Sequence, residues 1–177
     1  SFLRGINVSG KNKIVMAELV SAYKTLGYTQ VKSYLNTGNI IFYIDRKSVG
    51  ELEVEIETMI SKEFGLEIEV IVKSIDQVVE LTKSYPFESL DGKNRYITML
   101  KSDVDNGLSN HIDKIIKEGD QYLISASNVY LYIPTGYGKT KVTNTFIEKK
   151  SCGIGTTRNV NTLEKLLRVA NELINKS

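Results

Sequence analysis

The chain has 177 residues, enough for one domain of ordinary size or two small ones. Lysine and arginine together number 23 and aspartate and glutamate 21, so the formal net charge of +2 is too small to predict a nucleic-acid partner. The single cysteine, Cys152, excludes an internal disulfide framework and predicts a reducing, cytosolic compartment. We expect no membrane span, because no apolar run approaches about 18 residues, and no signal peptide.

The first half of the chain carries the pattern of a split βαβ unit. Each predicted helix has apolar residues on one face and stops at a glycine. The turn Thr37-Gly38-Asn39 joins the two middle strands, since glycine and asparagine tolerate positive φ. In chain order the predicted elements are a strand over 2–8, a helix ending at Gly27, strands over 31–36 and 40–44, a helix ending at Gly65 and a strand over 67–72.

The same order of elements is predicted again in the second half, after a helical connector over 76–83. A final helix has an apolar stripe from Leu163 to Ile174, with Asn161 as its predicted N-cap and Glu164 as the capping-box partner. The second set consists of a strand over 95–100, a helix over 108–116, strands over 122–125 and 129–133, a helix over 141–149 and a short strand over 154–158.

Two consecutive βαββαβ units predict an α+β fold of two tandem ferredoxin-like plaits with antiparallel sheets and an extra C-terminal helix. The predicted boundaries are 1–75 for the first plait, 76–94 for the helical connector, and 95–177 for the second plait with the terminal helix. The strand over 40–44 is apolar on both faces. We therefore expect the open face of each sheet to be covered, by the other plait or by a second chain.

Two segments that precede helices combine polar and basic residues, Arg4-Gly5-Ile6-Asn7-Val8-Ser9-Gly10-Lys11-Asn12-Lys13 and Thr156-Thr157-Arg158-Asn159. Backbone N–H groups at a helix start attract anions, lysine adds a point charge, and arginine offers a bidentate fork. The alternative is structural: a solvated loop, an arginine paired with a carboxylate, and simple helix capping. The candidate ligand-binding residues, including the turn between the middle strands, are Arg4, Asn7, Lys11, Asn12, Lys13, Gly38, Asn39, Arg158 and Asn159.

Three stretches of the chain resemble one bacterial family. They are the segment from Leu3 to Lys13 with Met16-Ala17-Glu18-Leu19, then Tyr34-Leu35-Asn36-Thr37-Gly38-Asn39, then Thr156-Thr157-Arg158-Asn159. This family is known as domain of unknown function 1697 and is also called the SP0830-like family. The resemblance spans essentially the whole chain and implies two ferredoxin-like plaits but no activity, since the family has none established. One departure is Val160, where the family usually has tryptophan after the Arg-Asn pair, so a ligand that stacks on that indole would be bound differently here.

Other motifs fail as catalytic or nucleotide sites. The stretch Gly136-Tyr137-Gly138-Lys139-Thr140 is interpreted as a surface turn, because Ile133 stands where a P-loop needs its first glycine. His111 is the only histidine and Cys152 has no local partner, so neither predicts a metal site or a nucleophile. Tyr130 lies where RNA-recognition modules carry stacking aromatics, but their consensus is missing and packing is the preferred interpretation.

We therefore predict no catalytic constellation, no metal site and no cofactor. The leading hypothesis is a cytosolic protein that binds a small anionic ligand, such as a nucleotide or a phosphorylated metabolite, and has no membrane partner. Nucleic-acid binding is disfavoured, and a protein-interaction module is the other alternative. The sequence leaves enzyme activity and oligomeric state open.

Overall fold

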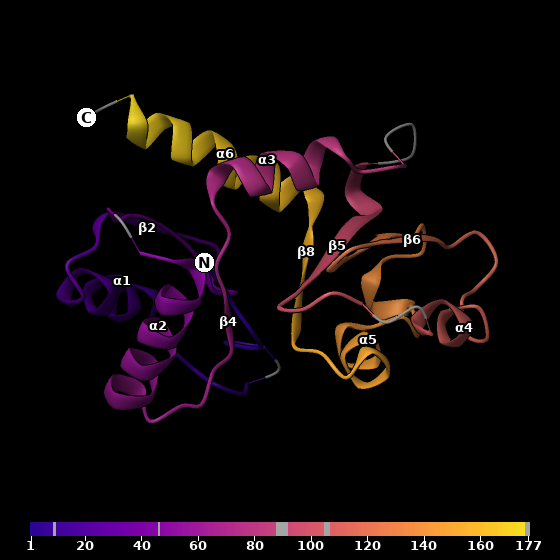
Figure 1. Ribbon diagram of the computed structural model, residues 1–177, viewed down its shortest axis with the longest axis horizontal. Helices are drawn as coiled ribbons and strands as arrows, with labels where there is room; N and C mark the ends of the chain where they lie inside the picture. Colours follow the sequence, from indigo (N-terminus) through magenta and orange to yellow (C-terminus); the bar gives the residue numbers. More distant parts are fainter. Residues whose placement is uncertain (9, 46, 88–91, 105–106, 176–177) are drawn as a thin grey trace. The chain divides into compact units, whose positions relative to one another are not determined.

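The computed structural model describes residues 1–8, 10–45, 47–87, 92–104 and 107–175 (Figure 1). The chain divides into two compact units. Unit 1 comprises Ser1–Ser74 and Val169–Ser177, and unit 2 comprises Ile75–Arg168. The last helix, α6 (Val160–Ile174), contributes residues to both units.

Unit 1 is built on a four-stranded sheet with the strand order β2-β3-β1-β4, in which every neighbouring pair is antiparallel. Its elements are β1 (Phe2–Leu3), α1 (Met16–Thr25), β2 (Thr29–Tyr34), β3 (Asn39–Tyr43), α2 (Val49–Phe64) and β4 (Val70–Ile71). The apolar faces of both helices pack with the sheet in one buried core, which includes Leu3, Leu19, Tyr23, Ile40, Ile56, Ile60 and Val70.

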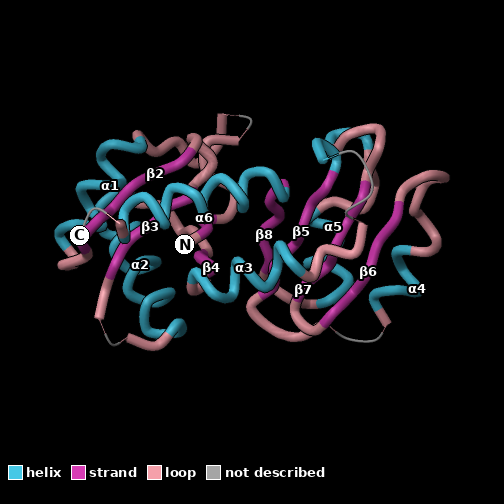
Figure 2. The backbone as a smooth tube through the Cα atoms, turned by 90° about the horizontal axis from the view of Figure 1, so that it is seen from above, coloured by secondary structure: helices cyan, strands magenta, loops and turns pink. Residues whose placement is uncertain are grey.

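Unit 2 has a second antiparallel sheet, with the order β6-β7-β5-β8, whose strands lie side by side in Figure 2. Its core on the side of α4 and α5 includes Leu100, Leu108, Ile112, Val129, Leu131, Val142 and Ile147. Its elements are α3 (Ile75–Lys83), η1 (Gly92–Asn94), β5 (Arg95–Leu100), α4 (Leu108–Ile112), β6 (Gln121–Ser125), β7 (Asn128–Tyr132), η2 (Tyr137–Lys139), α5 (Asn144–Ser151), β8 (Gly155–Asn159) and the start of α6.

The two units repeat one topology. Replacing β1, β2, β3 and β4 by β5, β6, β7 and β8 converts the strand order of unit 1 into that of unit 2. The helices α1 and α2 of unit 1 likewise correspond to α4 and α5 of unit 2. This duplication confirms the predicted α+β fold of two tandem ferredoxin-like plaits with an additional C-terminal helix.

The last strand of unit 1 is shorter than the predicted 67–72. Only Val70–Ile71 forms β4, at one edge of the sheet. The amide of Val70 donates to Glu57 Oε1 of α2 at 2.8 Å, and the amide of Val72 donates to Glu53 Oε1 at 2.9 Å. Glutamate side chains of a helix thus bind edge amides that a further strand would otherwise pair.

Two helices of unit 2 also differ from their predicted bounds. The helix predicted over 108–116 ends at Ile112, and the carbonyl of Ile112 accepts from the amides of both Ile115 and Ile116 (2.9 Å each), a shared bond common at helix ends. The helix predicted from residue 141 begins at Asn144, where Thr143 Oγ1 accepts a hydrogen bond from the amide of Phe146 at 3.2 Å.

The N-terminus of α6 is capped by Asn159 and not by the predicted Asn161. The Asn159 Oδ1 accepts a hydrogen bond from the amide of Asn161 at 2.9 Å. The Nη2 of Arg95 instead donates to Asn161 Oδ1 (3.3 Å) and to Glu164 Oε1 (3.4 Å). A contact between α6 and the first residue of β5 therefore replaces the predicted capping box.

Candidate functional site

A loop held by its own side chains replaces most of the predicted strand over 2–8. β1 ends at Leu3, because positive φ angles at Gly5 (66°) and Asn7 (53°) take the chain out of the β region. The amide of Asn7 donates to the carbonyl of Asn12, and Asn12 Nδ2 donates to the carbonyl of Gly5, both at 3.1 Å. The basic segment is consequently a turn-rich loop that leads into α1.

Asn7 lies at the centre of this loop. Its Nδ2 donates to the carbonyls of Ile14 and Asn36, each at 2.9 Å, and its Oδ1 accepts from the amide of Ile14 at 2.9 Å. The side chain therefore joins the residue just before the N-cap of α1 to the turn between β2 and β3. Since both amide hydrogens are used inside unit 1, Asn7 positions the loop around the candidate site.

A surface hollow of about 530 Å³ opens beside this loop, at the N-terminus of α1. Its lining combines polar loop residues with the start of the helix. The residues that concern ligand binding are Asn7, Gly10, Lys13, Val15, Glu18 and Asn36. The hollow thus brings together two residues of the predicted set, Asn7 and Lys13, with a helix start.

The first turn of α1 has no side-chain cap. Val15 occupies the N-cap, and its aliphatic side chain has no acceptor atom. The first intrahelical bond runs from the amide of Leu19 to the carbonyl of Val15, at 3.0 Å. The amides of residues 16–18 precede that bond and have no intrahelical acceptor, so they carry the partial positive charge of the helix N-terminus.

The charges around the hollow are mixed. Lys11 and Lys13 are both exposed, and Lys13 lines the hollow. Glu18, in the first turn of α1, is an exposed carboxylate that lines it too. Arg4 is half-buried, and its backbone amide donates to the carbonyl of Glu69 at 2.9 Å. Neither Val15 nor Glu18 is among the predicted ligand-binding residues, although an aliphatic residue before a helix is a readable sign of a missing cap.

Gly38 and Asn39 are buried parts of the turn between β2 and β3. A Cβ on Gly38, which has φ +78°, would lie 2.7 Å from the Cβ of Leu3. The Nδ2 of Asn39 donates to the carbonyl of Tyr34 (3.0 Å) and to Thr37 Oγ1 (3.1 Å). Packing and turn geometry explain why glycine and asparagine stand at these two positions. The predicted role of both residues in ligand binding stays a prediction.

Arg158 and Asn159 belong to unit 2, at the end of β8. Arg158 Nη1 donates to Thr156 Oγ1 (2.7 Å) and to the carbonyl of Thr157 (2.9 Å). Burial lowers the pKa of the Arg158 guanidinium to about 10, so it stays protonated at neutral pH. Asn159 caps α6 and also donates from Nδ2 to the carbonyl of Lys93 at 2.8 Å.

The tyrosine considered for RNA stacking is buried. Tyr130 is 4% exposed and lies edge-to-face against Tyr85, with ring centroids 6.0 Å apart. The hydroxyl of Tyr85 in turn donates to the carbonyl of Leu131 at 2.7 Å. Unit 2 therefore uses Tyr130 for internal packing.

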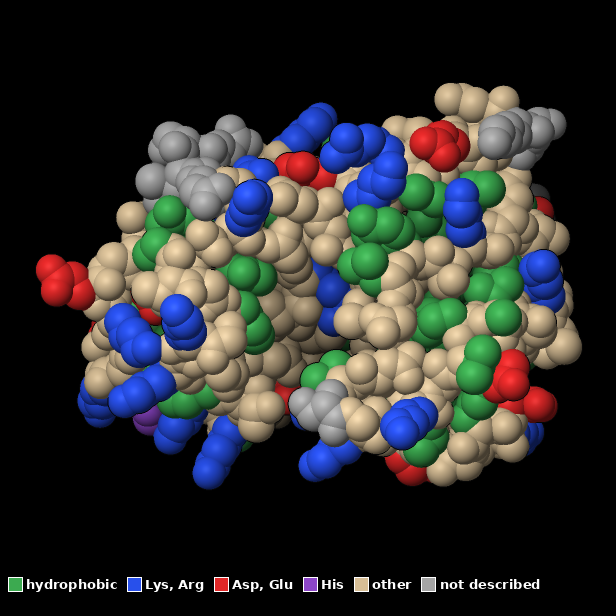
Figure 3. All heavy atoms as spheres, turned by 180° about the vertical axis from the view of Figure 1, so that it is seen from behind, with side chains coloured by type: hydrophobic (Ala, Val, Ile, Leu, Met, Phe, Trp, Pro, Cys, Tyr) green, Lys and Arg blue, Asp and Glu red, His purple; other side chains and the backbone are tan. Residues whose placement is uncertain are grey.

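On the face shown in Figure 3, the described lysine and arginine side chains stand at several separate places.

A polar cluster around Tyr137 is satisfied within unit 2. In unit 2 the hydroxyl of Tyr137 donates to Thr157 Oγ1 (3.1 Å) and accepts from the amide of Asn144 (2.7 Å). Thr157 Oγ1 also donates to Asn144 Oδ1 at 3.0 Å. This network fixes the turn η2, as expected for a surface turn. Within the described part of the chain, no group of three or more histidine, cysteine, aspartate or glutamate side chains is placed to hold a metal ion.

Comparisons with known proteins agree with this architecture. The model of the family "Protein of unknown function (DUF1697)" matches residues 1–130. The structure of the conserved bacterial protein SP0830 from Streptococcus pneumoniae is similar with a TM-score of 0.69 and 24% identity, covering 96% of each chain. That likeness supports the fold alone. Curated proteins give no match to this chain. Among the described residues, no helix has both the length and the apolar character that crossing a membrane requires.

Proposed function

Because this chain belongs to the DUF1697 family, a family of proteins of unknown function, its activity has to be argued from its own residues. We propose that it is a cytosolic protein whose unit 1 binds a small anionic ligand, a nucleotide or a phosphorylated metabolite, at the N-terminus of α1. Arg4, Lys11 and Asn12 belong to the loop that bounds this site, and Lys13 supplies the cation nearest to the ligand.

The uncapped start of α1 carries the proposal. Val15 leaves the first-turn amides without a side-chain acceptor, and the same residue lines the hollow of about 530 Å³ together with Lys13. Volumes of roughly 300–1,000 Å³ are usual for small-ligand sites. A phosphate placed there accepts hydrogen bonds from backbone amides and gains about 0.3–1 kcal/mol from the helix dipole.

Glu18 sets the strength of this site. Its carboxylate lines the same hollow as Lys13 and repels an anion, which limits the affinity. Removing the charge in Glu18→Gln is therefore expected to strengthen binding of an anion. This gain of affinity distinguishes a real site from a surface lysine that attracts anions weakly.

The test is a thermal-shift screen with inorganic phosphate, nucleotides and sugar phosphates at fixed ionic strength. A compound at 100 times its dissociation constant stabilises the folded state by about 2.7 kcal/mol, which raises the midpoint by several degrees. Lys13→Ala is expected to weaken the binding of that compound roughly fivefold, and Glu18→Gln to strengthen it. Lys24→Ala, which removes the same charge at the other end of α1, is the matched control.

Equal loss of affinity in Lys13→Ala and Lys24→Ala would show that the anion responds to net charge alone, and the proposal would be wrong. An absence of any shift across the screen has the same consequence.

A further inference from the structure

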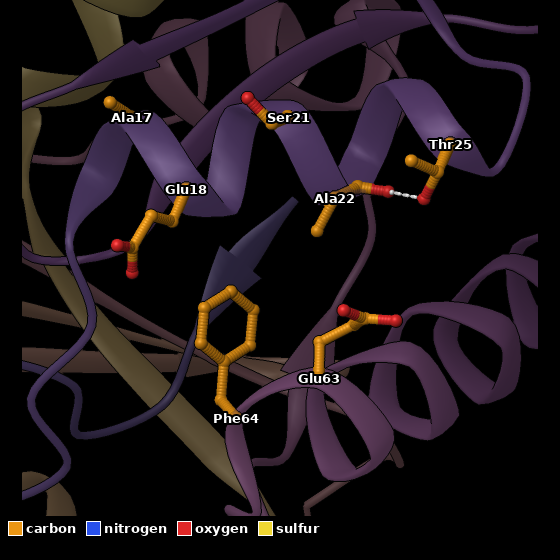
Figure 4. Close-up of a pocket in the computed structure, with 7 residues that line it drawn as sticks. All are labelled: Ala17, Glu18, Ser21, Ala22, Thr25, Glu63 and Phe64. Carbon is orange, nitrogen blue, oxygen red and sulfur yellow. Dashed lines mark hydrogen bonds between the residues drawn. The ribbon is translucent and has the colours of Figure 1, made fainter.

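Unit 1 has a second hollow, between its two helices. Figure 4 shows α1 and α2 running antiparallel, with an open space of about 470 Å³ between them. The lining comes from five residues of α1 (Ala17, Glu18, Ser21, Ala22 and Thr25) and the last two of α2 (Glu63 and Phe64). We call this space the α1–α2 groove.

Small side chains on α1 keep the groove open. Ala17, Ser21 and Thr25 follow one another at intervals of four, so they lie along one side of the helix. The hydroxyl of Thr25 donates to the carbonyl of Ala22 at 2.8 Å, so its polar group is satisfied within α1 (Figure 4). Apart from Glu18, the α1 wall of the groove therefore consists of small side chains and is low enough for another backbone to approach closely.

Two carboxylates flank an aromatic ring in the groove. In Figure 4 the side chains of Glu18 and Glu63 extend into the space from opposite helices, with the ring of Phe64 between them. Both glutamates are exposed, and within the described chain neither side chain makes a hydrogen bond or an ion pair. Lys24 and Lys62, in the last turns of the two helices, are not among the lining residues.

The position of Phe64 and Glu63 adds to this negative character. They are the last two residues of α2, where the helix dipole favours a cation by about 0.3–1 kcal/mol. An ammonium or guanidinium group over the face of Phe64 gains roughly a further 0.5–1 kcal/mol. The groove therefore complements a positive charge carried on an apolar stem.

From this complementarity we propose that the α1–α2 groove docks a helix of a partner protein that carries lysine or arginine beside alanine-sized residues. Helices bind in grooves of this kind by laying small and apolar side chains against the floor. The lysine or arginine stem covers Phe64, and its charged end reaches Glu18 or Glu63. Since the groove is open, a small free amine would stay mostly in water, and a helix buries much more of the apolar floor.

The experiment measures fluorescence anisotropy of a labelled peptide titrated with the full chain. The probe is an alanine- and leucine-rich helical peptide of about 18 residues with lysine at every fourth position, long enough to be helical. Its control has glutamate in place of every lysine. We expect the lysine peptide to bind and the glutamate peptide not to bind.

The variants locate the binding. The double variant Glu18→Gln with Glu63→Gln is expected to weaken binding of the lysine peptide roughly three- to tenfold, because two exposed ion pairs are lost. Ser21→Lys, which puts a cation on an exposed position of the α1 wall, is expected to weaken it at least as much. Glu118→Gln with Glu172→Gln removes the same charge from exposed positions outside the groove and is expected to leave binding unchanged.

Two results would overturn the proposal directly: no binding of the lysine peptide, or equal weakening of its binding by the control double variant. Displacement of the peptide by spermidine would overturn it too, because it would show that the groove binds a small free amine and not specifically a helix. Although both sites include Glu18, the outcome here is distinguishable from that at the anion site. Glu18→Gln strengthens phosphate binding and weakens the lysine peptide, so the two proposals fail separately.

Discussion

The first strand of unit 1 and the first strand of unit 2 occupy the same place in two sheets of identical order, yet they are built differently. β1 pairs with its neighbours only at Phe2 and Leu3, whereas β5 pairs with both neighbours along nearly its whole length from Arg95 to Leu100. One backbone bond follows each of these strands, from the amide of Arg4 to the carbonyl of Glu69 after β1 and from the amide of Lys101 to the carbonyl of Ile154 after β5, both at 2.9 Å. Beyond Arg4, the side chain of Asn7 joins the loop to the carbonyls of Ile14 and Asn36, whereas beyond Lys101 the backbone amide of Val104 still donates to the carbonyl of Ala126 at 3.1 Å.

This difference separates a repeat that is held mainly by strand pairing from a repeat that is held in part by side-chain hydrogen bonds. Where strand pairing continues, backbone N–H and C=O groups bond to one another, and few single side chains determine the stability. Where the ladder stops early, backbone groups have to be satisfied by side chains, and the loop becomes free to form a hollow at a helix start. We therefore expect the stability of unit 1 to depend on a few residues near β1, and that of unit 2 to be spread along its strands.

The largest expected effect is at Gly38, which lies against β1. The carbonyl of Gly38 accepts from the amide of Leu3 at 2.8 Å, and an added Cβ would lie 2.7 Å from the Leu3 Cβ. Gly38→Ala is expected to lower the free energy of unfolding of unit 1 by about 3 kcal/mol, from positive-φ strain and overpacking together. Urea unfolding followed by circular dichroism measures this loss.

Gly27→Ala is the matched control for that substitution. Gly27 has φ +84°, but a Cβ there would meet nothing within 4 Å. Only the conformational strain applies, and the expected loss is about 1 kcal/mol. Equal losses at Gly27 and Gly38 would mean that close packing against β1 contributes nothing.

The second effect concerns Asn7. Asn7→Ala removes three hydrogen bonds of 2.9 Å and is expected to lower the free energy of unfolding of unit 1 by about 2 kcal/mol. Amide hydrogen exchange of α1 and of the β2–β3 turn, measured by mass spectrometry, is expected to accelerate in both segments.

Ser102→Ala is the counterpart in unit 2, just after β5. Ser102 is exposed, and the expected change in unfolding free energy is within about 0.5 kcal/mol. If Asn7→Ala were equally silent, the loop after β1 would not depend on its central side chain, and the contrast between the two units would disappear.

Asn7 also shows how far sequence reasoning reaches. The repeat of six elements, the glycine stops and the turn at Gly38 were predictable, because they follow from local periodicity and backbone preference. The partner of Asn7 was not, because its bond to the carbonyl of Asn36 joins residues 29 positions apart and forms only in the folded sheet. The early end of β1 follows from the same contacts.

The α1–α2 groove is a further example. Ala17, Ser21 and Thr25 are visible as a row of small residues in the sequence, but a row of small residues is equally typical of two helices packed closely together. Whether α2 closes over that row depends on where the sheet places both helices. The apolar periodicity of each helix predicts only which face meets the sheet.

The smallest expected effect is a change in the stability of unit 2 with pH. In Asp120 the buried Oδ1 has no hydrogen-bond partner within the described chain, and Oδ2 accepts only a long bond from Thr140 Oγ1 at 3.4 Å. Burial raises the pKa of Asp120, against the opposing effects of the Thr140 bond and the Lys117 charge. The folded state therefore holds this proton more tightly than the unfolded state, and unit 2 loses stability as pH rises from about 4 through the raised pKa.

Asp120→Asn removes the charge and keeps an acceptor for Thr140, so it is expected to stabilise unit 2 at pH 7 and to flatten that part of its pH dependence. Exchange protection of β6 and β7, corrected for the intrinsic effect of pH on exchange, measures the change, and α2 of unit 1 serves as the internal reference. Asp103→Asn, at an exposed position, is the control and is expected to change the stability of neither unit.

A gain of stability at pH 7 that persisted undiminished at pH 3 would contradict the titration of Asp120, because the wild-type carboxyl is already neutral there. Such a result would place the gain of stability in the packing of the amide and not in the removal of a partly buried charge.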